Sequence, residues 1–153
     1  MKKKGLTVWQ GILAAFVLLT VLFIWSNSLK TGTASGAQSG YFKDIFRQMF
    51  DITKEPFQFL YNNLRKVAHF AEFALLGAET AALAASCRTR RPWRNAIGLA
   101  FCVTVAAIDE GLQLLVPGRA GALVDVGIDA AGALLGTLCV ACLVGLVRLF
   151  KKK

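Results

Sequence analysis

The sequence predicts an all-α integral membrane protein, a single domain over residues 1–153 built as a bundle of about four transmembrane helices. Hydrophobic residues make up 56% of the chain and charged residues only 18%, whereas soluble domains carry about 25% charged residues. The charges gather in short clusters between long apolar runs. This composition excludes a disordered chain, and four Cys are too few for a small disulfide-stabilised scaffold. The net charge of +9 is not spread over a nucleic-acid-binding face, so we expect no nucleic-acid partner.

The clearest span covers about residues 6–26 and lies within a stretch of 25 residues without charge. About 20 apolar residues are enough to cross the hydrocarbon core of a bilayer. Trp9 and Trp25 near the two ends of this span are typical of interfacial anchors. A signal peptide cleaved near Ser35 is the alternative, but the apolar stretch exceeds the usual core of about 7–15 residues. We therefore expect a retained helix.

An extracytoplasmic segment should join the first and second spans. Residues 26–40 are rich in Ser, Gly and Thr, which is typical of a loop. From Tyr41 onwards apolar residues recur with a helical period, and charged residues fill the opposite face, so we expect an amphipathic helix over about 41–52. A face of Phe and Met suits a helix in the membrane interface, and packing of that face on the bundle is a compatible alternative.

Three further spans are expected at about 67–86, 95–117 and 123–148. An even number of spans places both termini on one side of the membrane. Eleven basic residues then lie on the side of the termini and seven on the other side, where three acids accompany them. Because positive charge is retained in the cytoplasm, both termini should be cytoplasmic. Small residues recur four apart, at Gly132 and Gly136 and at Ala74 and Ala78, and predict close helix packing.

Six acids and one His lie in or beside the last three spans, where insertion of one charge costs about 3 kcal/mol. By their positions along the spans, six of these seven groups lie in the outer half of the membrane, and Glu79 lies deeper. Helical spacing places Asp109 and Gln113 on one face of their helix, and Asp125 and Asp129 on one face of theirs. A hairpin at Pro117 brings the last two spans together. We therefore expect an outward-facing polar pocket, and a structural ion-pair network is the alternative. The candidate binding residues are Arg65, Lys66, His69, Glu72, Asp109, Glu110, Gln113, Arg119, Asp125 and Asp129.

Three kinds of chemistry fit these side chains: acid–base catalysis, metal binding, and binding of an anionic head group. Arg119 lies in the short turn between the last two spans, so we expect it to act as one coupled unit with Glu110, Asp125 and Asp129. The four Cys are expected to be packing residues, although two of them form a C-x-x-C. No metal ligand, cofactor or catalytic residue is assigned.

Two segments resemble a known family. RKVAHFAEFALLG at 65–77 and DEGLQLLVPGRAGALVDVGIDAAGALLG at 109–136 are similar to the VanZ-like family of bacterial membrane proteins, named after a protein associated with resistance to the glycopeptide teicoplanin. The resemblance implies a cell-envelope protein of the bacterial plasma membrane. The recurring polar residues of the family match Lys66, His69, Glu72, Glu110, Gln113, Arg119, Asp125 and Asp129.

Three functions are compatible with these features. The first is binding of an envelope lipid or of a lipoglycopeptide head group, with the lipid bilayer as the other partner. The second is an intramembrane enzyme that acts on a lipid-linked envelope precursor. The third is a structural polar network or a small transporter subunit, which would need to form a homo-oligomer because four helices make a thin transporter.

The first prediction concerns topology. In a variant without the native Cys, a Cys at Ser35 should react with a membrane-impermeant thiol reagent added to intact cells, and a Cys at Arg90 should not. The physical reason is the excess of basic residues on the side of the termini. The reverse labelling pattern, or a mature N-terminus near Gln38, would overturn the predicted topology.

Overall fold

A computed structural model describes residues 7–87 and 93–151, and within these ranges the chain forms six helices and no strand. The helices are α1 (Val8–Ser28), α2 (Gly32–Met49), α3 (Phe57–Asn62), α4 (Leu64–Ser86), α5 (Trp93–Leu114) and α6 (Leu123–Phe150). By length and composition α1, α4, α5 and α6 can each cross a membrane. The all-α membrane bundle with four spans is therefore confirmed.

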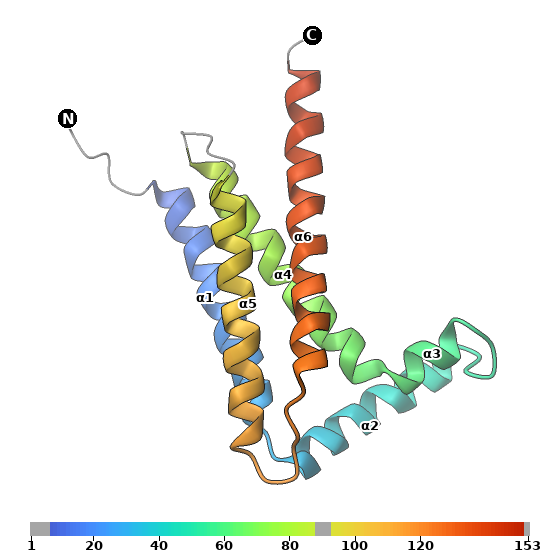
Figure 1. Cartoon of the computed structure of the whole chain (residues 1–153). Coiled ribbons are helices and arrows are strands. Elements are labelled where there is room, and N and C mark those ends of the chain that lie inside the picture. The colour runs from blue at the N-terminus through green and yellow to red at the C-terminus, as the bar shows by residue number, and fades with distance from the viewer. Residues whose placement is uncertain (1–6, 88–92, 152–153) are drawn as a thin grey trace.

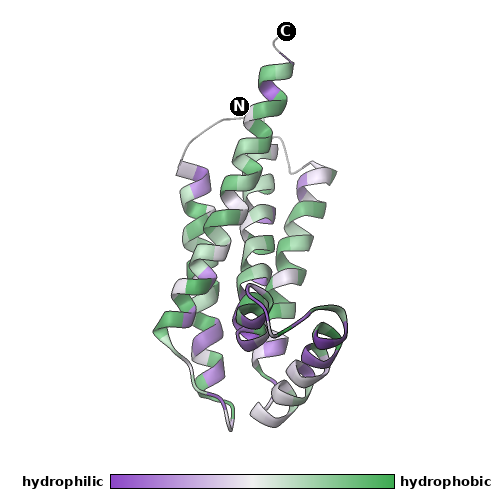
Figure 2. Ribbon diagram, turned by 90° about the vertical axis from the view of Figure 1, so that its right-hand side faces the viewer, coloured by the Kyte–Doolittle hydropathy of each residue, from purple (hydrophilic) through white to green (hydrophobic). Residues whose placement is uncertain are grey.

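The four long helices place their connections at two ends of the bundle (Figure 1). The start of α1 and the end of α6 lie at one end, and α2, α3 and the turn between α5 and α6 lie at the other. Figure 2 shows apolar residues along the four long helices and many hydrophilic residues gathered at the end that carries α2 and α3. Several basic residues of the charge count lie outside the described residues, namely Lys2, Lys3, Lys4, Arg88, Arg90, Arg91, Lys152 and Lys153.

The first span begins at a capping box. The Thr7 hydroxyl accepts a hydrogen bond from the backbone N–H of Gln10 at 3.3 Å, and the Gln10 side chain accepts one from the N–H of Thr7 at 3.0 Å. These two bonds satisfy donors that a helix start leaves without partners. The helix continues two residues beyond the expected end, to Ser28, whose side chain is buried.

The expected loop over residues 26–40 is wrong over most of its length, because α2 already begins at Gly32. Thr31 caps this helix and accepts a hydrogen bond from the N–H of Ala34 at 3.3 Å. The N–H of Gly32 donates to the carbonyl of Pro117 at 3.2 Å, and a Cβ on Gly32 would overlap the backbone of Gly118. The small residues that suggested a loop thus let the helix start against the α5–α6 turn.

The amphipathic helix is present but ends at Met49, not at 52, because Phe50 is extended. A short helix that was not expected, α3, follows it. Aromatic rings join the two helices: the ring centroids of Phe50 and Phe57 are 4.8 Å apart, and those of Phe46 and Phe57 are 6.4 Å apart. No described residue of α2 is buried. Its location in the membrane interface stays a prediction.

The third span ends at Leu114, three residues before the expected end at 117. Leu115 and Val116 turn back onto the carbonyls of Leu112 and Gln113 at 3.1 Å, which closes the last helical turn. Gly118 then has φ of 76°, a conformation that glycine adopts readily. This conformation reverses the chain toward α6.

Close backbone contact joins α4 to α6, the pair of helices that packs most extensively. A Cβ on Gly132 would overlap the carbonyl of Phe70, and one on Gly136 would overlap the carbonyl of Ala74. Gly77 of α4 makes the reciprocal contact with α6. The predicted close packing is therefore confirmed for these glycines, and small residues are needed wherever two membrane helices approach this closely.

The buried apolar core lies between the four spans. Its members are Val21, Ile24, Phe73, Leu76, Cys102, Val105, Ala106 and Ala133. All four Cys are free. The expectation that they are packing residues holds for Cys102, which is fully buried, but Cys139 and Cys142 are exposed on α6.

The second prediction tests this packing. Gly136→Ala should lower the free energy of unfolding by about 1–3 kcal/mol, because the added methyl group forces the helices apart. Gly145→Ala is the matched control on α6: no atom lies within 4 Å of its added Cβ, and Ala is the better helix former. Thermal unfolding in detergent measures both changes. Equal effects of the two substitutions would contradict the close contact.

Candidate functional site

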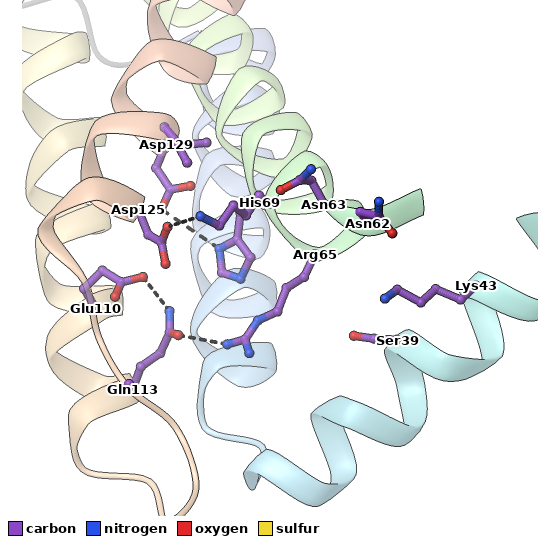
Figure 3. Close-up of a pocket in the computed structure, with 13 residues that line it drawn as sticks. Ser39, Lys43, Asn62, Asn63, Arg65, His69, Glu110, Gln113, Asp125 and Asp129 are labelled. Carbon is purple, nitrogen blue, oxygen red and sulfur yellow. Dashed lines mark hydrogen bonds and ion pairs between the residues drawn. The ribbon is translucent and has the colours of Figure 1, made fainter. Parts of the chain in front are cut away.

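A polar pocket of about 350 Å³ opens where α2, α3, α4, α5 and α6 meet, at the end of the bundle that carries α2 (Figure 3). Seven of the ten predicted site residues line it: Arg65, Lys66, His69, Glu110, Gln113, Asp125 and Asp129. Figure 3 shows Ser39 and Lys43 of α2 across the pocket from the acids of α5 and α6. The other three predicted residues, Glu72, Asp109 and Arg119, lie behind or beside the pocket.

Asp109 is the most enclosed acid and holds the network together. Its Oδ2 accepts hydrogen bonds from the Ser28 hydroxyl at 2.8 Å and from the Gln113 amide at 2.9 Å. Gln113 lies one turn along α5 from Asp109, so the predicted shared face is observed. The Gln113 carbonyl oxygen accepts from the Arg65 guanidinium at 3.0 Å. The amide therefore links an acid of α5 to a cation of α4.

Glu110 fixes the start of α6. Its Oε2 accepts a hydrogen bond from the N–H of Ala122 at 2.8 Å, and its Oε1 accepts from the Gln113 amide at 2.8 Å. Ala122 is the N-cap residue of α6. Since negative charge is stabilised at the start of a helix, this buried carboxylate stabilises the start of α6, where Ala122 supplies no side-chain cap.

His69 lies between two carboxylates that are fully buried. Its Nδ1 is 4.0 Å from Oδ2 of Asp109 and 3.9 Å from Oδ2 of Asp129. Oδ1 of Asp109 and both carboxylate oxygens of Asp129 have no hydrogen-bond partner within the described part of the chain. One potential ligand atom from each residue lies within 4.8 Å of the others. Such a group can hold a proton or a divalent cation.

Three basic side chains also border the pocket. Lys66 Nζ is 3.7 Å from Oδ1 of Asp125, and both side chains are partly exposed, so this ion pair is weak. Lys43 Nζ lies 5.1 Å from the ring centroid of Tyr61. Arg65 also keeps donors that the Gln113 contact does not use. Three positive charges are therefore available to an anion that enters the pocket.

The expected ion pairs of Arg119 with Glu110, Asp125 and Asp129 do not form within the described residues. Its Nη1 instead donates to the carbonyls of Asn27 at 2.9 Å and Ser28 at 2.6 Å. The last carbonyls of a helix lack intrahelical partners, and a cation there is favoured by the helix dipole. Arg119 therefore holds the end of α1 to the α5–α6 turn.

An apolar groove of about 430 Å³ adjoins the polar pocket and shares Ser39, Arg65 and His69 with it. Its apolar lining comes from α1, α2 and α4: Phe23, Phe42, Ile45, Phe46, Met49, Leu64 and Ala68. Glu72 and Arg119 also line this groove, and the Glu72 carboxylate accepts from the Asn27 amide at 3.5 Å. The site thus offers a polar and an apolar compartment side by side.

Glu79 belongs to neither cavity. Its carboxylate accepts a hydrogen bond from the Thr20 hydroxyl of α1 at 3.0 Å, two turns along α4 from Glu72. Glu79 therefore lies farther from the α2 end of the bundle than Glu72, and its depth in the membrane stays a prediction.

Sequence reasoning missed Ser28 and Lys43. Ser28 lay in a predicted loop and carries no charge, so nothing marked it as the donor to a buried acid. Lys43 stood on the polar face of the amphipathic helix, which is usually solvated. The spacing of residues within α2 could not indicate which spans this face meets.

The VanZ/LLP1 family model matches residues 11–146, which include most of each of the four spans. The chain belongs to the VanZ/LLP1 family. No curated protein and no solved structure matches it. Family membership and the four apolar helices show that the chain is a multi-pass membrane protein. Its family is linked to teicoplanin resistance.

The third prediction tests the network. A double-mutant cycle of Asp109→Ala and Gln113→Ala should show a coupling of about 0.5–3 kcal/mol in unfolding free energy, because the two side chains are hydrogen-bonded. The matched cycle of Arg119→Ala and Asp125→Ala should be additive within about 0.5 kcal/mol, since Arg119 binds backbone carbonyls. Strong coupling in the second cycle would instead support the coupling of Arg119 to Asp125 that the sequence predicts.

Proposed function

We propose that this VanZ/LLP1 protein binds an amphiphile of the cell envelope, with its anionic head group in the polar pocket and its hydrocarbon chain in the apolar groove. The observation that carries this proposal is the contact between the two cavities, which share Ser39, Arg65 and His69. A ligand with one charged end and one apolar end would fill both at once.

The head group would be held by cations and amides. Arg65 and Lys66 extend from the first turn of α4, and Lys43 approaches from α2. Arg forms forked hydrogen bonds with phosphate or carboxylate, and Lys adds a mobile positive charge. Asn62 and Asn63 line the same side and can donate through their amides. This side of the pocket suits an oxyanion.

The chain would lie along α2. Phe42, Ile45 and Met49 are exposed residues that recur at helical spacing and line the groove. Because lipid tails are as apolar as these side chains, the chain would be held by van der Waals packing and not by the hydrophobic effect. The bilayer itself is the second partner in this proposal, because the groove must take the chain from the surrounding lipid.

Two sources fit this chemistry. One is a lipid-linked phosphate of an envelope precursor, and the other is an acylated glycopeptide such as teicoplanin. Both would reach the pocket from the extracytoplasmic side if the termini are cytoplasmic. The charge count over the full sequence supports that orientation, because eleven basic residues lie on the side of the termini and seven on the other side.

A second candidate function is an intramembrane enzyme that acts on a lipid-linked envelope precursor. It is favoured by the position of His69 between Asp109 and Asp129, because an imidazole beside buried carboxylates can transfer protons. Conversion of a supplied polyprenyl-linked precursor would support this function. Binding of the unmodified lipid without turnover would favour the first.

The fourth prediction tests the head-group contacts. Arg65→Gln and Lys66→Gln should each weaken binding of a polyprenyl phosphate about tenfold, because each removes one positive charge from the pocket. Lys54→Gln is the control, since its side chain is 76% exposed and lines neither cavity. Native mass spectrometry in detergent measures the bound fraction. Equal binding by all three variants and the unaltered protein would contradict the proposal.

The apolar compartment is tested with neighbouring aromatic residues of α2. Phe42→Ala should weaken binding of the same lipid, whereas Tyr41→Ala should not, because Tyr41 lies outside the groove. Teicoplanin and a glycopeptide without an acyl chain form the second arm. Equal binding of these two glycopeptides would exclude the groove as the site for the acyl chain.

A further inference from the structure

We propose that His69, Asp109 and Asp129 bind a divalent transition-metal cation at the floor of the polar pocket. The binding of the metal itself is independent of the proposed function. The further step, that the metal contacts the phosphate of the head group, rests on that function.

The three side chains converge from three spans: His69 from α4, Asp109 from α5 and Asp129 from α6. Their ligand atoms all lie within 4.8 Å of one another. Nitrogen and oxygen ligands bind such metals at about 2.0–2.2 Å, so two ligands of one ion are separated by at most about 4.4 Å. The separations of 3.9 and 4.0 Å from His69 Nδ1 fall within this limit. Small side-chain rotations would bring all three ligand atoms within bonding distance of one ion.

The oxygen atoms that a metal would need are without partners. Both carboxylate oxygens of Asp129 and Oδ1 of Asp109 accept no hydrogen bond within the described residues, although both side chains are completely buried. Buried polar atoms are nearly always satisfied in native structures. Three orphaned oxygens on two adjacent acids therefore point to a ligand that donates positive charge.

The nearby cations do not satisfy these acids. Arg119 binds carbonyls of α1, Arg65 binds Gln113, and Lys66 pairs with Asp125. Within the described part of the chain no Lys or Arg lies within 4 Å of Asp109 or Asp129. Two buried carboxylates without a cation beside them are strongly destabilising. One dication would neutralise both, with a neutral imidazole as its third ligand.

The hydrogen bonds to Asp109 resemble those that orient a metal-binding carboxylate. Ser28 and Gln113 both donate to its Oδ2, the oxygen that lies 4.0 Å from His69 Nδ1, and its Oδ1 accepts no hydrogen bond within the described residues. Carboxylates that bind metals are in turn held by such hydrogen bonds, which fix their orientation. One imidazole and two carboxylates suit Mn²⁺, Fe²⁺ or Zn²⁺ better than Ca²⁺, which prefers oxygen ligands alone.

The position of this group connects it to the pocket. His69 and Asp129 line the pocket, while Asp109 lies behind them. Coordination positions that face the pocket would remain open to an oxygen of a phosphate. The cations Lys43, Arg65 and Lys66 border the same space, so a phosphate could contact the metal and the basic side chains together.

The experiment begins with the full chain in detergent, freed of metal by a chelator and titrated with Mn²⁺ and, separately, Zn²⁺. We expect one ion per chain by calorimetry and, for Mn²⁺, by electron paramagnetic resonance. Asp129→Asn and His69→Gln should each weaken binding about 100-fold, since loss of a supporting residue alone costs 10–100-fold. Glu79→Gln is the control, because this acid of α4 is bonded to Thr20 outside the site.

Thermal unfolding distinguishes a variant that has lost only the metal site from one that no longer folds. Without metal, Asp129→Asn should be at least as stable as the unaltered protein, because it removes a buried unpaired charge. With Mn²⁺ at a hundredfold excess over Kd, the midpoint of the unaltered protein should rise by roughly 5 °C or more, and that of the variant should not. No saturable binding, or equal binding by Asp129→Asn and His69→Gln, would overturn the metal site.

Lipid binding separates this inference from the proposed function. Removal of the metal should weaken binding of a polyprenyl phosphate at least tenfold. Unchanged lipid binding by the metal-free protein would overturn the metal–phosphate contact and leave the proposed function standing. Metal binding by a protein that binds no polyprenyl phosphate or teicoplanin would uphold the metal site and overturn the proposed function.

Discussion

The close approach of α4 and α6 is the constraint on which the rest of the structure depends. Gly132 meets the backbone of Phe70, and no side chain fits between them. Asp129 lies three residues before Gly132, and His69 directly precedes Phe70, so the contact that packs the helices also brings this acid to this imidazole. Side chains on opposite helices reach 3.9 Å only when the backbones are near. The packing glycines and the polar site are therefore parts of one arrangement, and a larger residue at the contact would separate both.

Neutral donors, not ion pairs, satisfy most of the buried charge. Asp109 accepts from a hydroxyl and an amide, and Glu110 accepts from an amide and a backbone N–H. A salt bridge in this setting must offset the desolvation of two ions, whereas an amide brings no second charge to desolvate. The basic residues are directed elsewhere: Arg119 to the end of α1, and Arg65 to Gln113. Within the described residues, Lys66 beside Asp125 is thus the one ion pair between a Lys or Arg and an acid of the pocket.

The spans could be predicted because a helix in lipid needs a long apolar run, and this requirement is local in sequence. The shared face of Asp109 and Gln113 could be predicted for the same reason, since one helical turn separates them. The partners of Arg119 could not, because backbone carbonyls occur at every residue and only the fold shows which ones are free. The start of α2 depends on the contact between Gly32 and the α5–α6 turn, which joins residues distant in sequence. Local composition indicated a loop there, and tertiary contact overrode it.

The polar residues divide into two groups according to their contacts. Glu110 and Arg119 make contacts that fix a turn or a helix end, and these contacts account for their presence without a ligand. Within the described residues the Asp129 carboxylate accepts no hydrogen bond, although it is buried and lies beside His69, which lines both cavities. An amide or an apolar residue at this position would cost the fold little stability. In the proposed site, Asp129 would supply ligand atoms beside an open pocket, on a helix whose position the glycine contacts fix.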